Sequence, residues 1–126
     1  MISKVGQIML YVNDQDKAVE FWTENMGFQK VAEENNGEMR WIEIAPATGS
    51  ETTIILHNRE TVAKMSPGLN LDTPSLMFFT DKLDQLHNDL SSRNVTVGEI
   101  VAMPSGRVFN FADYEGNYFA VMEKSK

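Results

Sequence analysis

His57 and Glu43 are the two side chains in this sequence that best combine proton chemistry with a strand position. His57 ends the apolar run Thr52–His57 and is one of two histidines in the chain. An imidazole that titrates near neutral pH is the commonest general base, and a carboxylate in the same cleft can act as acid or base. Glu43 shares a strand face with Trp41 because side chains alternate along a strand. The alternatives are a histidine hydrogen-bonded at the end of its strand and a solvated glutamate.

The elements that would position these side chains occur twice. Two six-residue strand candidates, Gln7–Val12 and Ser75–Thr80, are each followed by an acidic turn and an amphipathic helix. Later strand candidates also match in pairs: Arg40–Ile44 with Arg107–Phe111, and Thr52–His57 with Asn117–Met122. Two copies are too few for a solenoid, so the pattern indicates a duplicated β-α-β-β-β unit.

Local signals set the boundaries of the first copy. Asn13–Asp16 is typical of a helix N-terminus, and Gly27 is typical of the residue just past a helix end. Strands are expected at 28–32, 39–44 and 52–57.

In the second copy we expect a helix at 83–93 and strands near 95–101, 107–111 and 117–123. The helix has a predicted buried stripe of Leu83, Leu86 and Leu90. His87 is expected to be exposed beside this stripe.

Composition narrows the class of protein. A chain of 126 residues, 42% hydrophobic, predicts one soluble domain, with module one at about 1–58, a connector at 59–73 and module two at about 74–126. The absence of cysteine excludes disulfides and thiolate chemistry. A net charge of −7 argues against nucleic acid or an anionic membrane as partner. No apolar run is long enough to span a bilayer, and we expect a cytoplasmic protein.

Three segments carry a resemblance to a known family: Asn13–Trp22, Asn25–Phe28 and the turn Asp113–Asn117. Together with the opening strand they resemble the vicinal oxygen chelate superfamily, the group of glyoxalases, bleomycin-resistance proteins and extradiol dioxygenases. The resemblance covers essentially the whole chain. It implies an α+β fold in which two β-α-β-β-β modules form a curved half-barrel, and it implies pairing of modules in a homodimer.

The resemblance also implies where a divalent metal would be held, on the first and last strands of each module. Those positions are Gln7 and Ser75 on the first strands and Ile55 and Ala120 on the last strands. Only Gln7 offers a plausible ligand, since Ser75 is a poor one and the other two have no ligating atom. We therefore expect no metal and no cofactor.

The same positions, extended by alternation, define the concave face that the resemblance implies. It comprises Gln7, Met9, Tyr11, Trp41, Glu43, Ile55, His57, Ser75, Met77, Phe79, Asn110, Tyr118, Ala120 and Met122. All but Ile55 and Ala120 are candidate ligand contacts. Thioethers and flat rings suit planar or hydrophobic ligands, which a few polar groups can orient. Part of this face could instead be core or dimer interface.

Two functions follow as hypotheses. The first is metal-independent binding of a small hydrophobic or aromatic molecule, as in the bleomycin-resistance branch. The alternative is a lyase or isomerase of the glyoxalase type, or a dioxygenase-like enzyme, with a nonstandard site around Gln7, Glu43 and His57. The missing ligands at Ile55, Ser75 and Ala120 favour binding over catalysis. Arg40 and Arg107, which the repeat relates, are expected at strand ends, where either could clamp a ligand carboxylate.

Overall fold

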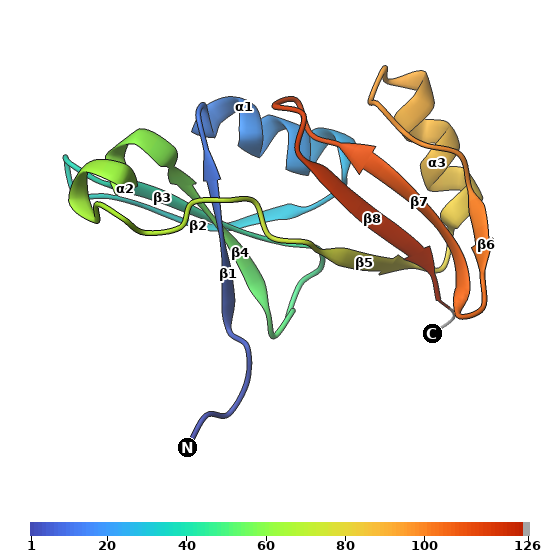
Figure 1. Cartoon of the computed structure of the whole chain (residues 1–126), viewed down its shortest axis with the longest axis horizontal. Helices are drawn as coiled ribbons and strands as arrows, with labels where there is room; N and C mark the ends of the chain where they lie inside the picture. Colours follow the sequence, from blue (N-terminus) through green and yellow to red (C-terminus); the bar gives the residue numbers. More distant parts are fainter. Residues whose placement is uncertain (125–126) are drawn as a thin grey trace. The chain divides into compact units, whose positions relative to one another are not determined.

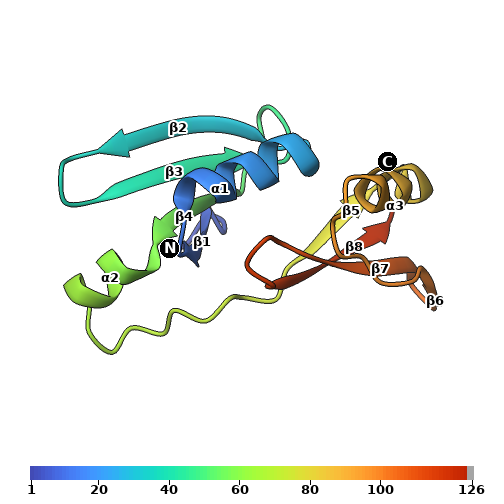
Figure 2. The same ribbon diagram turned by 90° about the horizontal axis from the view of Figure 1, so that it is seen from above.

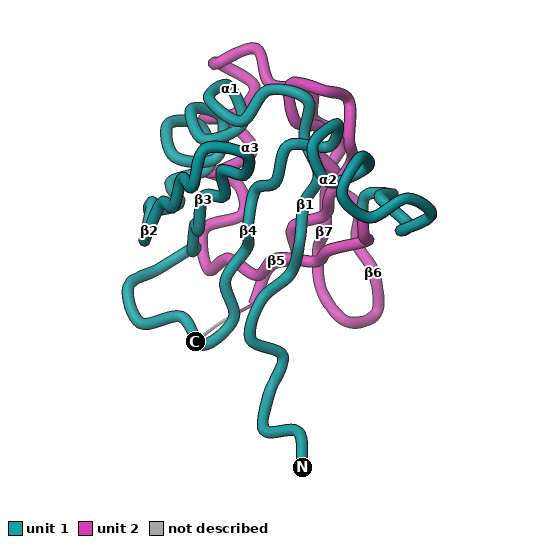
Figure 3. Tube along the Cα trace, turned by 90° about the vertical axis from the view of Figure 1, so that its left-hand side faces the viewer, with its two compact units in different colours: residues 1–73 teal, residues 74–126 magenta. Residues whose placement is uncertain are grey.

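A computed structural model of the chain describes residues 1–124 and divides them into two compact units. The first unit is Met1–Thr73 and the second begins at Pro74 (Figure 3). Each unit contains a four-stranded mixed sheet with a helix against it (Figure 1). The predicted α+β class and the duplicated β-α-β-β-β unit are confirmed. Within residues 1–124, no helix has the length and apolar character needed to cross a bilayer.

Module one is built around a sheet with the strand order β1-β4-β3-β2. Strand β1 runs parallel to β4, and the other neighbours are antiparallel. Its elements are β1 (Gln7–Val12), α1 (Gln15–Glu20), a π-helical turn η1 (Phe21–Asn25), β2 (Gln29–Asn35), β3 (Arg40–Ala45) and β4 (Thr53–Asn58). The connector that follows contains α2 (Arg59–Met65).

One face of this sheet is the core of module one. The helical segment α1–η1 lies along it (Figure 2), and the strand residues that point toward this segment are apolar and buried. They are Leu10, Val12, Ile42, Ile44, Ile54 and Leu56. Trp22, which is 0% exposed, contacts this core together with the rings of Phe21 and Phe28. The opposite face is left for the candidate site.

The start of α1 is fixed by two polar side chains. The Asp14 carboxylate accepts a hydrogen bond from the Lys17 backbone amide, which is the N-cap that the sequence predicts. The Gln15 side-chain amide is buried and donates to the carbonyl oxygens of Arg40 (2.7 Å) and Leu56 (2.9 Å). Gln15 therefore ties the helix to two strands of the sheet.

Module two repeats this plan with the strand order β5-β8-β7-β6, again with a parallel first pair, β5 and β8. Its elements are β5 (Met77–Thr80), α3 (Leu83–Ser92), β6 (Val101–Met103), β7 (Gly106–Ala112) and β8 (Tyr118–Glu123). Helix α3 covers an aromatic core face in which Phe111 and Phe119 lie 5.7 Å apart between ring centroids. Its predicted stripe is buried at Leu83 and Leu90 and half-buried at Leu86.

Two predictions of local structure are wrong, and one helix was not predicted. The connector contains helix α2, which Asn58 caps by accepting from the Thr61 amide. Ser75 lies outside β5, because the parallel ladder begins at Met77, opposite Ala120. The expected strand at 95–101 is reduced to a single bridge, between Val97 and Phe111, and the strand itself begins at Val101.

Candidate functional site

The face of the first sheet opposite α1 is the candidate site, and we call it the open face of module one. The strand register arranges its side chains in rows across β1, β4 and β3. Tyr11, His57 and Trp41 form one row. Met9, Ile55 and Glu43 form the next, and Gln7 lies beside Thr53 in the third. The predicted alternation is therefore correct for this half of the candidate face.

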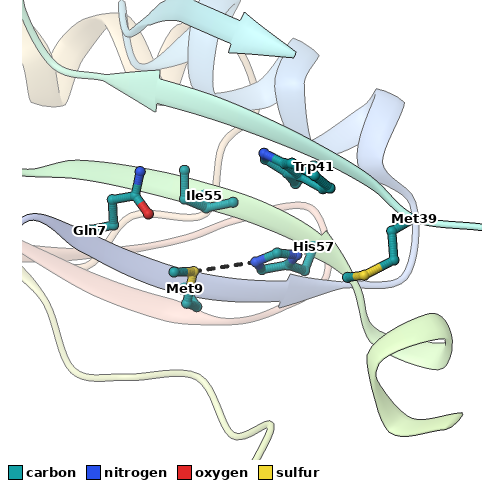
Figure 4. Close-up of a pocket in the computed structure, with 6 residues that line it drawn as sticks. All are labelled: Gln7, Met9, Met39, Trp41, Ile55 and His57. Carbon is teal, nitrogen blue, oxygen red and sulfur yellow. Dashed lines mark hydrogen bonds between the residues drawn. The ribbon is translucent and has the colours of Figure 1, made fainter. Parts of the chain in front are cut away.

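A pocket of about 280 Å³ lies on this open face (Figure 4). Its lining side chains come from β1, β4, β3 and the residue just before β3. They are Gln7, Met9, Met39, Trp41, Ile55 and His57. Apart from the Gln7 amide and the imidazole, the lining consists of thioether, indole and aliphatic groups, which suits an organic molecule with a large apolar surface.

His57 contacts Tyr11 in its own row and Met9 in the next row. Its ring stacks on Tyr11 at a centroid distance of 5.8 Å and an interplanar angle of 20°. Its Nε2 atom lies 3.3 Å from the Met9 sulfur, whereas Nδ1 is buried without a hydrogen-bond partner among residues 1–124. Burial lowers the pKa of His57 below its ordinary value, so the imidazole is neutral at pH 7. A proton on Nε2 fits this geometry because the Nε2–H group can then donate a weak hydrogen bond to the sulfur.

Glu43 is half-buried on the same open face. Its Oε2 atom accepts a hydrogen bond of 2.6 Å from the Thr53 hydroxyl. It is paired across the strands with Ile55, which lines the pocket, and is two residues from Trp41 on β3. The carboxylate therefore lies beside the pocket rather than in its lining. No basic side chain within residues 1–124 forms an ion pair with it.

The remaining predicted ligand contacts belong to module two. Met77 and Phe79 on β5, and Tyr118 and Met122 on β8, share the sheet face opposite α3 with Asn110. We call this the open face of module two. Met77, Phe79 and Tyr118 are 46%, 60% and 62% exposed, so this face presents an uncovered apolar surface within its own unit. Ser75 precedes the strand.

The two repeat-related arginines have other partners than a ligand carboxylate. Arg40 pairs with Asp16 and Glu33, each at 2.8 Å. Arg107 pairs with Asp84 and Glu123, again at 2.8 Å. In both modules the arginine at the start of a strand therefore holds an acidic residue in the first turn of the preceding helix, which identifies these side chains as structural.

The residues of this chain do not fit the divalent metal site of the family. The four positions carry Gln7, Ser75, Ile55 and Ala120, and Ile55 contributes only aliphatic carbon to the pocket. Within residues 1–124, no group of three or more His, Cys, Asp or Glu side chains converges to hold a metal ion. Too few anionic or imidazole ligands are present for such an ion.

Sequence reasoning missed Met39 and misplaced His87. Alternation from Trp41 puts Met39 on the open face, so the signal was present once the strand was recognised. His87 is half-buried rather than exposed: its Nε2 atom lies 2.8 Å from the Gly98 carbonyl oxygen and its ring meets Phe109 edge-on at 4.9 Å. It belongs to the helix-covered side of module two.

Comparison with known proteins places the chain in a family. The model of the Glyoxalase/Bleomycin resistance protein/Dioxygenase superfamily matches residues 4–121. The uncharacterized protein YetH of Bacillus subtilis is 32% identical over 125 residues, which cover 98% of this chain and all of YetH. Among solved structures, TnmS3, an antibiotic binding protein from Streptomyces sp. CB03234, is 30% identical with a TM-score of 0.83 and 98% coverage of both chains. A superfamily member from Sphaerobacter thermophilus is 26% identical with a TM-score of 0.82, also with 98% coverage of both chains. This chain therefore belongs to the glyoxalase/bleomycin resistance protein/dioxygenase superfamily.

Proposed function

We propose that this protein binds a small hydrophobic or aromatic molecule in the pocket on the open face of module one, without a metal ion. The observation that carries the proposal is the pocket of about 280 Å³. Its lining includes the Trp41 indole, the thioethers of Met9 and Met39, and the neutral imidazole of His57. Flat rings bind well against indole faces, and methionine adapts to the ligand's outline. The likeness to TnmS3, an antibiotic binding protein, supports binding rather than turnover.

Tryptophan fluorescence and thermal unfolding test this proposal directly. The chain has two tryptophans, and Trp22 is buried under the sheet, so Trp41 is the one that a ligand in the pocket would quench. Anthracene derivatives serve as planar probes. At about 100 times its dissociation constant a probe adds about 2.7 kcal/mol to the free energy of unfolding, which is seen as a rise in melting temperature.

A matched pair of variants locates the binding. Trp41→Ala should abolish most of the probe's stabilising effect, whereas Tyr114→Ala should preserve it, because Tyr114 is an exposed aromatic residue in the turn after β7. Equal losses in both variants, or no binding in the wild-type protein, would reject the proposal. Dialysis against a chelator should leave the dissociation constant unchanged. A loss of binding that zinc, nickel or iron restores would reject metal independence.

Turnover of the methylglyoxal–glutathione adduct tests the alternative, a lyase or isomerase built on Gln7, Glu43 and His57. Glu43 lies beside the pocket rather than in its lining, and the Nε2 atom of His57 is in contact with the Met9 sulfur. Binding is therefore the better-supported function. Turnover at ordinary enzyme rates that is lost in Glu43→Gln would reverse this ranking.

We also propose that the protein is a homodimer. The open face of module two exposes Met77, Phe79 and Tyr118 together, and apolar patches of this kind on a soluble protein usually mark association. Sedimentation at tens of micromolar should give a dimer, and Phe79→Glu should shift it toward the monomer. A wild-type chain that stays monomeric would contradict the homodimer.

Six residues of module two also remain proposed ligand contacts, and single alanine variants test them with the same probes. They are Ser75, Met77, Phe79, Asn110, Tyr118 and Met122.

A further inference from the structure

We propose that the molecule bound at the module-one pocket is a planar aromatic cation, whose positive charge is recognised by Glu43. The inference rests on the proposed function, since it names the charge of the ligand that the pocket takes. It comes from the order of side chains along the open face of module one and from an anionic group, the Glu43 carboxylate, that has no cationic partner among residues 1–124.

The rows on this open face change steadily in polarity along the strands. The first row is aromatic, with Tyr11, His57 and Trp41. The middle row places Met9 and Ile55 beside the Glu43 carboxylate. Successive rows are about 7 Å apart, because two residues of a strand rise by that distance. A ring system stacked at Trp41 would therefore reach Glu43 with a substituent that lies about 7 Å further along the strands.

Glu43 retains the capacity to bind a cation. A carboxylate can accept about four hydrogen bonds, and Oε2 of Glu43 uses one of them for the Thr53 hydroxyl. The nearest basic residue in sequence, Arg40, is already bound to Asp16 and Glu33. A half-buried carboxylate beside an apolar pocket gains most from a ligand that supplies the missing positive charge.

The other groups around the pocket also favour a cation over an anion. The Trp41 indole attracts cations through its ring face. On β2, Glu34 is paired across the strands with Trp41 and adds a second, exposed carboxylate at this end of the face. His57 is neutral, so it contributes no opposing positive charge. The net charge of −7 acts in the same direction at long range.

Three anthracene probes that share one ring system separate charge from shape. They are 9-aminomethylanthracene, a cation at pH 7, the neutral 9-anthracenemethanol, and the anion 9-anthracenecarboxylate. Dissociation constants are measured by quenching of Trp41 fluorescence, at low salt and at about 0.15 M salt. We expect the cation to bind about tenfold more tightly than the alcohol, and the anion to bind most weakly.

Isosteric variants assign the preference to a residue. In Glu43→Gln the advantage of the cation over the alcohol should fall to within about twofold, with the alcohol's own affinity unchanged. Glu34→Gln should reduce the advantage by a smaller factor. Glu20→Gln removes the same charge from the exposed side of α1 and should leave the advantage intact. Melting temperatures confirm that each variant is folded.

The outcomes distinguish the inference from the proposed function. If the three probes bind equally well, or the anion binds best, the inference is wrong while pocket binding stands. The inference is also wrong if Glu20→Gln and Glu43→Gln weaken the cation equally, because the effect would then come from net charge alone. If none of the probes binds, both proposals fail.

Discussion

The Nε2 atom of His57 lies 3.3 Å from the sulfur of Met9, across the parallel pair of strands β1 and β4. This contact joins the end of one strand to the middle of the other and forms part of the pocket wall. The other ring nitrogen, Nδ1, is buried without a hydrogen-bond partner among residues 1–124. His57 is thus held as a neutral ring in an apolar setting.

His57 should make the free energy of unfolding depend on pH. Burial lowers its pKa from the ordinary value of 6.5, so the unfolded chain binds the proton more readily than the folded chain. This contribution to stability is complete above pH 6.5 and is lost as the pH falls toward the folded-state pKa. Urea unfolding of wild-type protein and His57→Gln at several pH values measures the effect, and the slope in this window should be shallower in the variant.

The second histidine provides the control for this titration. His87→Gln removes the other imidazole, which lies in module two, and so shows whether the slope in this pH window depends on His57. The prediction is contradicted if the pH dependence of the free energy of unfolding disappears in His87→Gln and persists in His57→Gln.

Arg107 should control the acid titration of module two. The hydrogen bonds that its guanidinium donates lower the pKa of the Asp84 carboxyl from its ordinary value of 3.8. The pKa of Glu123 is lowered in the same way from 4.5. In Arg107→Gln the Asp84 pKa should therefore rise toward 3.8, as measured by carbon-13 NMR titration.

The stabilising effect of this cluster has a defined sign. Because both carboxyl pKa values are lowered in the folded chain, their contribution is present above the unfolded values and is lost as the pH falls through the folded values. Arg93→Gln removes an equal charge from the C-terminal end of the same helix, α3, and should leave the Asp84 titration unchanged. An Asp84 pKa that does not respond to Arg107→Gln would refute the assignment.

Gln15 should contribute to stability through its two hydrogen bonds to the sheet. Gln15→Ala leaves the carbonyl oxygens of Arg40 and Leu56 without this donor, at an expected cost of about 1–3 kcal/mol in the free energy of unfolding. Gln85→Ala is the matched control, because Gln85 is an exposed residue of α3, and it should change stability by less than about 0.5 kcal/mol. Equal losses in urea unfolding would show that the buried amide has no special role.

Trp22 should be the most sensitive position in the core of module one. It is 0% exposed and packs against Phe21 and Phe28, so Trp22→Ala should cost about 3–5 kcal/mol. Trp22→Phe retains a ring and should lose less, which keeps the comparison possible if the alanine variant does not fold. Val31→Ala, at a residue 56% exposed, should change stability by less than about 0.5 kcal/mol in thermal unfolding.

Gly27 should be required for the turn between η1 and β2. Its φ angle is +76°, in the left-handed region, and a Cβ atom added there would meet no other atom within 4 Å. Gly27→Ala therefore isolates the conformational cost, about 1–2 kcal/mol. Gly6→Ala is an informative control, since Gly6 has the same open surroundings without a positive φ. Urea unfolding that ranks the two variants in the opposite order would contradict the argument.

Some features of this protein are determined by sequence patterns of short range. The alternation of side chains assigned Trp41, Glu43 and His57 to one face, and the register confirms that assignment. Asp14 and Gly27 mark the helix ends because their own backbone and side-chain chemistry suits those positions. The duplication of the modules could be read for the same reason, since each copy repeats the same local periods.

Local signals for helix α2 are also present in the connector, although no helix was predicted there. Asn58 followed by Thr61 is an N-cap signal, and Glu60 pairs with Lys64 one helical turn later at 3.1 Å. Pro67 and Gly68 then follow the end of α2. These two residues mark where the helix stops, since proline and glycine commonly follow a helix end.

Tertiary structure alone decided how these residues meet. Strand order and register bring Met9 from β1 beside His57 from β4, and Trp41 from β3 onto its other side. They likewise direct Gln15 to two carbonyl oxygens and Arg40 to Asp16, residues far apart in the sequence. Alternation along one strand fixes only which face a side chain takes. The pocket depends on which residues of neighbouring strands are opposite one another, and that pairing is set by the packing of the whole sheet against its helix.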